Sequence, residues 1–377
     1  MAELSHRERV IRALNHKEPD RVPRDLGGTS VTTINETAYA RLLDYLGLEA
    51  EPEVRADRRA QTVSPSEALL RRLDVDCRSL SAGKSPSVSL SDISFKDEWG
   101  VTWTRPSGGH YINAGGPFQR DGLTLSDIKR HPWPDPRNPV RIEGLKDAAV
   151  RLHEGDYAVV LSVGNGVVSM CQRMRGFGEW MEDLVLDPAM AEALMEHCTG
   201  VSVEIAEFIL EEVGDYIDVA LFQDDLGFQD RSYMRPELYR EKVKPYHRRL
   251  VEATKSKTGA KVLMHSDGSV YSLIPDLIEI GVDALNPVQV SAKEMDAGRL
   301  KAEFGKDLSF WGGIDTHQVL PWGTPDDVRI DVKARIDALA SNGGYVVASV
   351  HNIQAEVPPE NIVAMFDAAL EYGQRAG

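Results

Sequence analysis

Cysteine is scarce in this 377-residue sequence, which has only Cys77, Cys171 and Cys198 and no CxxC pair. Three such widely spaced cysteines indicate a reducing compartment and no disulfide framework, so we expect a cytoplasmic protein. Cys171 follows the turn Gly164-Asn165-Gly166, but no neighbouring residue marks it as an activated nucleophile. We therefore expect this thiol to pack in the core rather than to take part in catalysis.

An excess of positive charge and long apolar runs are also lacking. The formal net charge of −16 at pH 7 argues against a general affinity for nucleic acid or anionic membranes. No segment offers the roughly 18 apolar residues of a membrane-spanning helix, and the first residues lack the apolar stretch of a secretory signal. We expect a soluble protein with a small-molecule substrate, which can still be anionic because a pocket can differ in sign from the surface.

Internal repeats, low-complexity tracts and a GxGxxG motif after the first expected strand are absent too. The hydrophobic share of 42% and the charged share of 27% are ordinary for a globular protein. A chain of this length can form two domains or one large barrel. Since nothing in the sequence divides it, we predict one domain over residues 1–377. The missing glycine motif weakens the dinucleotide-binding alternative.

Short apolar segments are present in a regular order. From residue 143 onward, six of them alternate with helical patterns, which predicts a parallel sheet. Eight such segments in total favour a closed (β/α)₈ barrel over an open doubly wound sheet. The expected strands cover residues 21–26, 75–80, 157–163, 216–222, 261–265, 282–285, 308–311 and 345–350.

Residues 83–135 interrupt this order. Two β-prone segments, residues 95–104 and 109–112, are joined through Pro106-Ser107-Gly108-Gly109, and proline-rich residues 132–136 end the region. This pattern predicts a β-hairpin insertion. The hairpin could be a lid, a contact surface for a partner, or a packed surface decoration.

Polar side chains stand where the apolar segments end. In (β/α)₈ barrels the active site lies at the carboxyl ends of the strands, so these residues are the candidates for function. For each one alone, the alternative is a structural role, such as capping the following helix. The catalytic candidates are Asp25, Asp225 and Asp267, and the substrate-binding candidates are Asn165, Gln223, Asp224, Asn286, Gln289, Asp315 and Asn352.

His265, Asp267 and His351 form the most economical set of metal ligands. Residues two apart on a strand point the same way, so His265 and Asp267 can converge on one point. Imidazole nitrogen and carboxylate oxygen suit Zn²⁺, and three protein ligands leave a position for water or substrate. Asp224 or Asp225 could be a fourth ligand or support the others. A polar pocket without metal is the alternative.

Several of these segments resemble a known family, and the resemblance covers nearly the whole chain. The segments are residues 7–16, 19–23, 223–227 (QDDLG), 265–277, 286–289 (NPVQ), 311–315 (WGGID) and 351–354 (HNIQ). They are similar to the uroporphyrinogen decarboxylase superfamily. That resemblance implies a (β/α)₈ barrel, commonly a homodimer, with its pocket at the mouth where the candidate residues lie.

The chain resembles one branch of that superfamily more than the other. True decarboxylases resemble one another in an arginine-rich segment of the type RQAGR after the first strand, where this chain has DLGGT at residues 25–29. The other branch consists of zinc methyltransferases that move methyl groups to or from a corrinoid. Those that act on thiols resemble one another in an H-x-C motif and a distant cysteine. Here His265 matches the histidine, Asp267 replaces the first cysteine and His351 lies near the second position.

Nitrogen and oxygen ligands keep zinc harder and more electrophilic than thiolates do, which suits polarising an ether, alcohol or carboxylate oxygen. The leading hypothesis is a zinc methyltransferase that moves a methyl group from a small methoxylated or otherwise methylated substrate to a corrinoid protein. Zinc, or a proton from Asp225 or Asp267, would stabilise the oxygen leaving group.

Two other classes stay open. A metal-independent decarboxylase or lyase would use Asp25 or Asp225 to stabilise a developing cation or to donate a proton. A non-catalytic tetrapyrrole- or corrinoid-binding protein would bind its ligand without turnover. The clustered carboxylates favour an enzyme, because like charges in one cleft usually persist by holding a cation or carrying protons.

Overall fold

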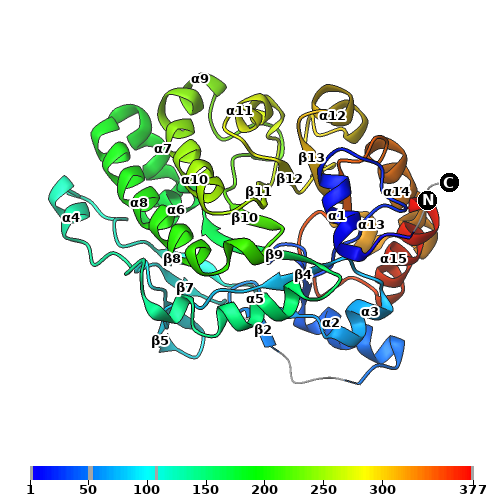
Figure 1. The fold of residues 1–377 in the computed structure, drawn as a ribbon. Coiled ribbons are helices and arrows are strands. Elements are labelled where there is room, and N and C mark those ends of the chain that lie inside the picture. Colours follow the sequence, from blue (N-terminus) through cyan, green and yellow to red (C-terminus); the bar gives the residue numbers. More distant parts are fainter. Residues whose placement is uncertain (1–2, 50–53, 107–108, 375–377) are drawn as a thin grey trace.

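Seven apolar segments form one curled parallel sheet in the computed structural model, which describes residues 3–49, 54–106 and 109–374. Each of these strands overlaps a segment that the sequence predicts. Figure 1 shows the sheet at the centre of the molecule. In spatial order the strands are β14 (Tyr345–Ser349), β13 (Ser309–Ile314), β12 (Ala284–Asn286), β11 (Lys261–His265), β10 (Val219–Gln223), β9 (Ala158–Asn165) and β4 (Cys77–Leu80).

Helices connect these strands and cover the outer face of the sheet (Figure 1). Local sequence signals start several of them: Asp187 accepts from the Met190 N–H and Pro188 is the first residue of the longest helix, as expected for a capped start. The helices are α1 (His6–Leu14), α2 (Glu36–Leu46), α3 (Glu67–Arg72), α4 (Leu125–Arg130), α5 (Leu145–His153), α6 (Val167–Arg175), α7 (Phe177–Leu186), α8 (Pro188–Val213), α9 (Pro236–Leu238), α10 (Lys244–Lys257), α11 (Ile274–Glu279), α12 (Ala297–Phe304), α13 (Val319–Trp322), α14 (Pro325–Leu339) and α15 (Pro359–Gly373). No helix within the described ranges is both long and apolar enough to cross a bilayer.

Side chains on the two faces of the sheet enter two different cores. Leu221 and Leu263 belong to a small cluster on the inner, concave side, together with Trp311. Phe222 and Met264, one position further along, pack in the large cluster shared with the helices. Both faces are therefore apolar, which explains why the strands read as continuous apolar runs.

The first predicted strand, residues 21–26, is not a strand in the structure. Arg24 makes only an isolated parallel bridge to Val347 of β14, and on its other side the Asp76 N–H donates to the Arg24 carbonyl. Pro23 lies in this segment and has no N–H to donate, which limits the pairing to a short stretch. The structure thus contains seven of the eight predicted strands, with residues 23–25 hydrogen-bonded to β14 on one side and to Asp76, next to β4, on the other.

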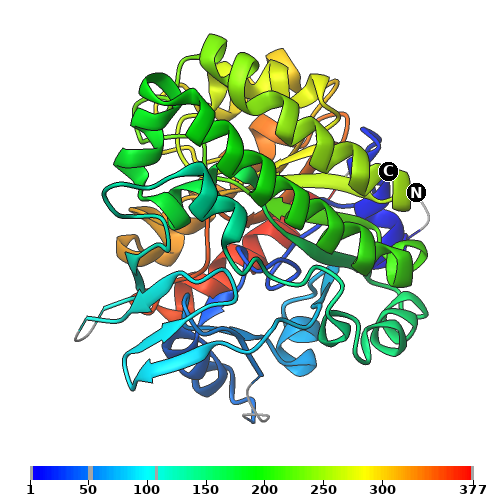
Figure 2. The ribbon, with the colours of Figure 1, turned by 90° about the vertical axis from the view of Figure 1, so that its left-hand side faces the viewer.

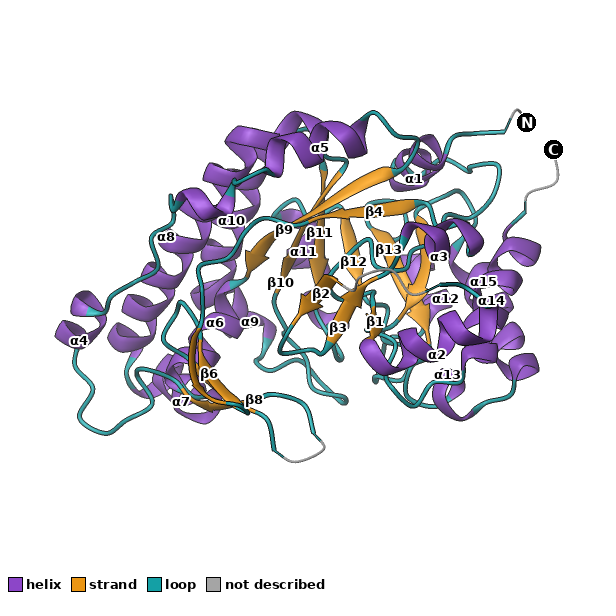
Figure 3. Cartoon of the chain, turned by 90° about the horizontal axis from the view of Figure 1, so that it is seen from below, coloured by secondary structure: helices purple, strands orange, loops and turns teal. Residues whose placement is uncertain are grey.

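Two small antiparallel sheets lie outside the main one. The first has the order β1 (Ile34–Asn35), β3 (Thr62–Ser64), β2 (Val54–Asp57), and the second has the order β5 (Val88–Ser91), β6 (Ser94–Lys96), β7 (Thr102–Thr104), β8 (Ile112–Gly115). Figure 2 shows the second sheet in cyan at the lower left, and its strand β8 contacts α6 (Figure 3).

The second sheet corrects the prediction of a single hairpin at residues 83–135. Four strands are present, and β5 was not expected because its serines and exposed apolar residues do not mark a buried strand. Phe95 and Trp103 are cross-strand partners on the buried face. Ser107 and Gly108, in the loop where the hairpin turn was predicted, lie outside the described residues.

A buried carboxylate, Asp76, ties the N-terminal segment to the start of β4. Its oxygens accept from Arg9 Nη1 and Arg21 Nη1, each at 2.7 Å, and from the Arg24 N–H at 2.8 Å, while His6 Nδ1 lies 2.7 Å away. Burial alone would raise the pKa of Asp76, but His6 and the two guanidinium groups outweigh it and lower this pKa to about 2. The carboxylate therefore favours the folded state.

We expect Asp76→Asn to lower the free energy of unfolding by about 3–5 kcal/mol, because it leaves buried guanidinium groups without their counter-charge. Since the folded pKa lies below the unfolded one, the contribution is complete above about pH 4 and is lost as the pH falls toward 2. Urea denaturation at several pH values would measure this. Asp230→Asn is the control, because the Asp230 side chain is 62% exposed and its partner Arg231 is 70% exposed, and the change should cost about 1 kcal/mol or less. Equal losses in the two variants would contradict the assignment.

Candidate functional site

Four polar side chains lie in one row across the carboxyl ends of β9 to β12. The parallel register pairs Gln223 with both Asn165 and His265, and pairs His265 with Asn286. Leu263 faces the inner core, and His265, two residues later on β11, points to the same side. The row therefore lines the concave end of the sheet, where the sequence predicts the site.

His265, Asp267 and His351 come together at this end of the sheet. One ligand atom from each residue lies within 4.8 Å of the others. His265 Nε2 is 3.6 Å from Asp267 Oδ2, and the two imidazole rings have their centroids 5.6 Å apart. The three residues proposed as metal ligands are thus close enough to bind one ion.

Asn286 fixes the orientation of His265. The Asn286 Nδ2 group donates to the Trp311 carbonyl at 3.1 Å, which leaves Oδ1 to accept from His265 Nδ1 at 2.6 Å. With Nδ1 donating to Asn286, the imidazole directs Nε2 toward Asp267, where this atom can hold either a proton or a metal ion. Metal-binding histidines are commonly held by such a partner on the other ring nitrogen. The residues therefore fit a zinc ion.

The charges around this cluster also favour a cation. Burial disfavours the imidazolium form of His265, but Asp267 and Asp225 outweigh burial and raise the pKa of His265 to about 9. Burial would raise the pKa of Asp267, yet the neighbouring histidines lower it. Burial lowers the pKa of His351, which keeps that ring neutral. The two carboxylates thus stabilise one positive charge, which a bound metal ion could supply in place of the proton.

Asp225 lies at the edge of this cluster. Its carboxylate is 3.8 Å from His265 Nε2 and accepts from the Asp267 N–H at 3.1 Å. The side chain is 39% exposed, so it can contact a ligand as well as the metal residues. This geometry leaves Asp225 available as a fourth ligand or as an acid.

The loops that carry Asp225 and Asp267 are in close backbone contact at Gly227 and Gly268. Gly268 has φ +86°, and a Cβ at this position would lie 2.2 Å from the Gly227 carbonyl oxygen. The Ser269 N–H donates to the Phe228 carbonyl at 2.7 Å. A side chain at position 268 would force the two loops apart, so glycine is required there.

Asp224, predicted to bind substrate, is turned away from this site. It follows Gln223 and therefore points to the opposite face of the sheet, where it is fully buried. Its carboxylate accepts from the Val168 and Ser169 N–H groups at the start of α6, and His247 Nε2 lies 2.6 Å away. Asp224 therefore caps the start of α6. This is the structural role expected from the sequence as the alternative to a functional one.

Asp25, predicted to be catalytic, is 1% exposed. Its carboxylate accepts from Thr32, from Trp311 Nε1 and from the Gly28 N–H. Burial raises the pKa of Asp25 to about 6 although these donors oppose the shift. The protein encloses this carboxyl group entirely, so its position is unsuited to contact with a substrate.

The remaining predicted residues hold the loops around the site. Gln289 accepts from the Gly268 N–H at 2.6 Å, Asn352 from the Thr33 N–H at 2.9 Å, and Asp315 from the His317 N–H at 2.7 Å. Gln223 donates to Ser30 Oγ, and Asn165 accepts from Arg173. Of these five, Gln223, Asn165 and Asp315 are only partly buried.

Sequence reasoning missed an aromatic group and two arginines close to the site. Phe177, Phe228 and Tyr233 contact one another with ring centroids 4.6–5.7 Å apart, and the first two are 41% and 37% exposed. The Tyr233 N–H donates to the Leu226 carbonyl at 2.7 Å, which joins Tyr233 to the loop that carries Asp225, and burial, Asp225 and Asp267 together raise the pKa of Tyr233. The one sequence signal for this aromatic group is the F-x-x-x-x-Y spacing of Phe228 and Tyr233. The arginines, Arg59 and Arg173, come from distant segments that no motif connects.

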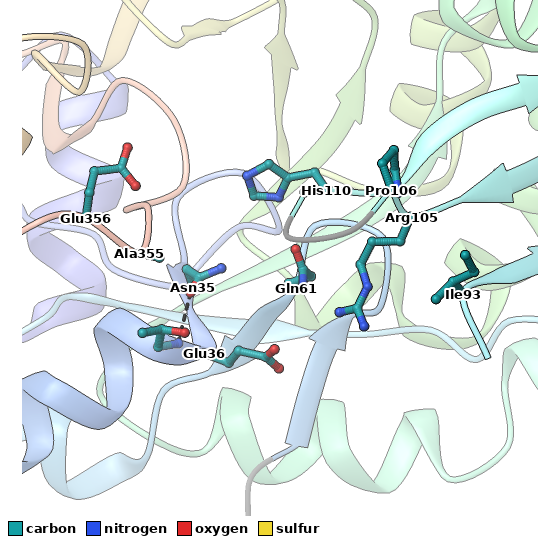
Figure 4. A pocket seen from close by; sticks show the side chains of 11 residues that line it. Asn35, Glu36, Gln61, Ile93, Arg105, Pro106, His110, Ala355 and Glu356 are labelled. Atoms are coloured by element: carbon teal, nitrogen blue, oxygen red, sulfur yellow. Dashed lines mark hydrogen bonds between the residues drawn. The ribbon is translucent and has the colours of Figure 1, made fainter.

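A separate pocket of about 640 Å³ lies between the two small sheets and the loop after β14. Figure 4 shows its lining, which mixes Arg105 and His110 with Glu36 and Glu356. None of the three metal-cluster residues lines this pocket. It opens instead beside Asn35, which caps α2.

The fold and the polar cluster define a parallel α/β protein with its candidate site at the carboxyl ends of the strands. The family model described as "Uroporphyrinogen decarboxylase (URO-D)" matches residues 110–372, and the chain belongs to this family. The resemblance stated from the sequence is thereby confirmed.

Relatives within the family divide between two reactions. A uroporphyrinogen decarboxylase from Pelodictyon phaeoclathratiforme is 23% identical over 49% of this chain and 50% of its own length. A methylated-thiol–coenzyme M methyltransferase from Methanosarcina mazei is 24% identical over 63% of this chain and 61% of its own length. The chain thus aligns with half to three-fifths of these curated relatives. A solved methyltransferase from Methanosarcina mazei shares the fold at TM-score 0.67 and 17% identity, covering 98% of this chain and 99% of that one.

We expect the wild-type chain to bind zinc near stoichiometrically, and His351→Ala or Asp267→Ala to bind little, because each removes one of the three converging ligands. Elemental analysis after dialysis would measure the zinc content. The matched control is His317→Ala, since His317 lies near Asp267 but outside the cluster. Zinc retained in a His265→Ala, His351→Ala double variant would refute the assignment.

Loss of the Asn286 side chain should weaken zinc binding by roughly 10–100-fold, because His265 would lose the group that orients its ring. Competition with a coloured chelator would measure the zinc affinity of Asn286→Ala. Asn286→Asp keeps an acceptor at Oδ1 and should restore most of the affinity. Unchanged affinity in Asn286→Ala would show that the ring is oriented by other groups.

Proposed function

We propose that this chain is a zinc-dependent methyltransferase that moves a methyl group from a small methoxylated substrate to a corrinoid protein. The observation that supports this most directly is the convergence of His265, Asp267 and His351 within 4.8 Å. The likeness to two methyltransferases, one by sequence and one by fold, supports the reaction type. No thiolate belongs to the cluster, which favours oxygen-bound methyl groups over methylated thiols.

His265, Asp267 and His351 would hold the zinc ion, with Asp225 beside them. When bound, zinc would supply a Lewis acid that polarises the oxygen of the methoxyl group. Asn286 keeps Nε2 of His265 directed into the site, and Gln289 holds the Gly268 N–H next to Asp267. The site is therefore organised before any ligand arrives, which limits the cost of reorganisation during the reaction.

Asp225 is the residue proposed to handle the proton. Its carboxyl group is partly exposed and close to His265 Nε2, so it can deliver a proton to the oxygen from which the methyl group departs. A neutral alcohol or phenol is a better leaving group than its anion, and a positioned acid supplies this advantage. The aromatic group formed by Phe177, Phe228 and Tyr233 lies nearby to contact the apolar part of the substrate.

A corrinoid protein as methyl acceptor, and a homodimer as the assembled form, are proposed from the sequence resemblance to the methyltransferase branch of the superfamily.

We expect chelation to abolish methyl transfer from a methoxylated substrate to a cobalt(I) corrinoid, and added zinc to restore it. Asp225→Asn should lower kcat by roughly 10²–10⁴-fold while zinc content stays unchanged, because it removes the proton donor and no member of the metal cluster. The spectrum of the corrinoid reports methyl-cobalt formation directly. Full activity of metal-free His265→Ala would refute the proposal.

One observation favours a second candidate, a metal-independent carboxy-lyase. His265 Nε2 lies 3.6 Å from Asp267 and 3.8 Å from Asp225, so two carboxylates favour the protonated ring and raise the pKa of His265, and a protonated imidazole can donate to a carbanion formed by loss of CO₂. The decarboxylase relative is consistent with this chemistry. Release of CO₂ by protein from which a chelator has removed all metal, in the absence of corrinoid, would favour this candidate.

A further inference from the structure

Arg59 and Arg173 are two partly buried cations that have no carboxylate partner among the described residues. Within residues 3–49, 54–106 and 109–374, no carboxylate oxygen lies within ion-pair distance of either guanidinium group. Within the described part of the chain, the Arg173 guanidinium group donates to Asn165 Oδ1, at 2.9 Å, and to the Met170 sulfur, and to no other side chain. Most other buried or half-buried arginines of this acidic protein are paired, as Arg9, Arg141 and Arg175 are.

Both guanidinium groups lie over one ring, that of Trp103, within the range of cation–π attraction. The Cζ atom of Arg59 lies 4.7 Å from the ring centroid, and that of Arg173 lies 5.9 Å from it. Trp103 is held in turn by its Nε1 group, which donates to Asp97 Oδ2 at 2.8 Å. This placement over a ring leaves the edges of a guanidinium group, with their N–H donors, free to bind an anion.

The backbone around these side chains is also fixed. Asp57 accepts from the Arg59 and Ala60 N–H groups, which sets the turn between β2 and β3. The Arg173 carbonyl on α6 accepts from Asn113 Nδ2 of β8 at 2.9 Å. Three segments that are far apart in sequence thus form one preorganised arrangement.

This arrangement lies beside the metal cluster. Asn165, which holds Arg173, is two strands away from His265 in the same row, so their backbones are about 10 Å apart. Arg59 is close enough to His351 to contribute to lowering its pKa, after burial and its nearer neighbours. A small aromatic molecule could therefore touch both the arginines and the metal cluster.

The charges around the Arg59 and Arg173 guanidinium groups favour the binding of an anion. Burial and repulsion by Arg59 lower the pKa of Arg173 to about 10, although Asp225 and two other carboxylates oppose the shift. Among the described residues no carboxylate is in ion-pair contact with either group, so the repulsion between the two cations is only partly offset. An arrangement of this kind is typical of a binding site whose ligand brings the opposite charge.

We propose that Arg59 and Arg173, both over the ring of Trp103, bind the carboxylate of a methoxylated aromatic acid and direct its methoxyl group toward His265, Asp267 and His351. The aromatic group formed by Phe177, Phe228 and Tyr233 provides contacts for the ring of such a substrate. This inference rests on the proposed methyl transfer for the identity of the reacting group, but carboxylate binding itself does not.

The first test compares 4-methoxybenzoate with 4-methoxybenzamide by calorimetric titration of the full chain loaded with zinc. The two ligands have the same size and differ in charge. The acid should bind at least about tenfold more tightly than the amide, since charge-assisted hydrogen bonds to guanidinium groups are lost with the amide. Equal affinities would overturn the proposal, and this comparison needs no variant protein.

The second test uses Arg59→Gln and Arg173→Gln. Each should weaken binding of the acid by roughly tenfold or more and change the affinity for the amide less than about twofold. Arg58→Gln is the matched control, because Arg58 is the neighbouring residue, is partly buried, and lies over the ring of Phe95 instead, with its Cζ atom also 4.7 Å from the ring centroid. Arg173→Lys keeps the charge but not the planar fork and should show an intermediate loss. Wild-type affinity in both glutamine variants, or an equal loss in Arg58→Gln, would overturn the proposal.

The outcomes separate this inference from the proposed function. Arginine-dependent binding of the acid without methyl transfer to a corrinoid would support the carboxylate subsite and refute the methyltransferase. Methyl transfer at equal rates from 4-methoxybenzoate and from methoxybenzene, unaffected by Arg59→Gln, would support the methyltransferase and refute the subsite.

Discussion

The parallel register of β9 to β12 is the constraint on which the candidate site depends. Hydrogen bonding pairs Asn165, Gln223, His265 and Asn286 across four neighbouring strands, and the alternation of side chains directs the row to the concave side. A shift of one residue in β11 would turn His265 into the helix-packed core and bring Met264 into its place. The apolar residues that precede the row, buried on both faces, are therefore what secures the position of the polar ones.

The same alternation assigns opposite tasks to two adjacent carboxylates. Asp224 faces outward and accepts from the first N–H groups of α6, while Asp225 reaches the metal cluster. Because α6 also carries Arg173, the anchor at Asp224 helps to set the distance between the arginine pair and His265. Two consecutive residues at the end of β10 thus connect the metal cluster, through Asp225, with helix α6, through Asp224.

The sequence predicts the parts of this structure that depend on neighbouring residues in the chain. Seven strands follow from apolar runs with helical segments between them, and the pairing of His265 with Asp267 follows from their spacing of two. His351 could be added because it ends another strand. The first strand was overestimated because the backbone around Pro23 forms only a short pairing with β14.

Other features arise only in three dimensions. Nothing local distinguishes Asp25, enclosed by Thr32 and Trp311, from an accessible carboxylate at the end of a strand. Arg59 and Arg173 are separated by more than a hundred residues, and Trp103, between them in sequence, brings them together through a sheet that was expected to be one hairpin. The enclosure of Asp25 and the proximity of Arg59 to Arg173 depend on burial and on long-range pairing. Neither can be inferred from single residues in the sequence.

The close approach of Gly227 and Gly268 has a consequence for engineering this scaffold. The two loops touch through their backbones, so neither can be lengthened or replaced alone without disturbing the other. A chimera that takes one of these loops from a relative would need to take both. Exchange of loops around the site would therefore have to replace both loops together. The exposed rings of Phe177 and Phe228, in contrast, can be substituted one at a time.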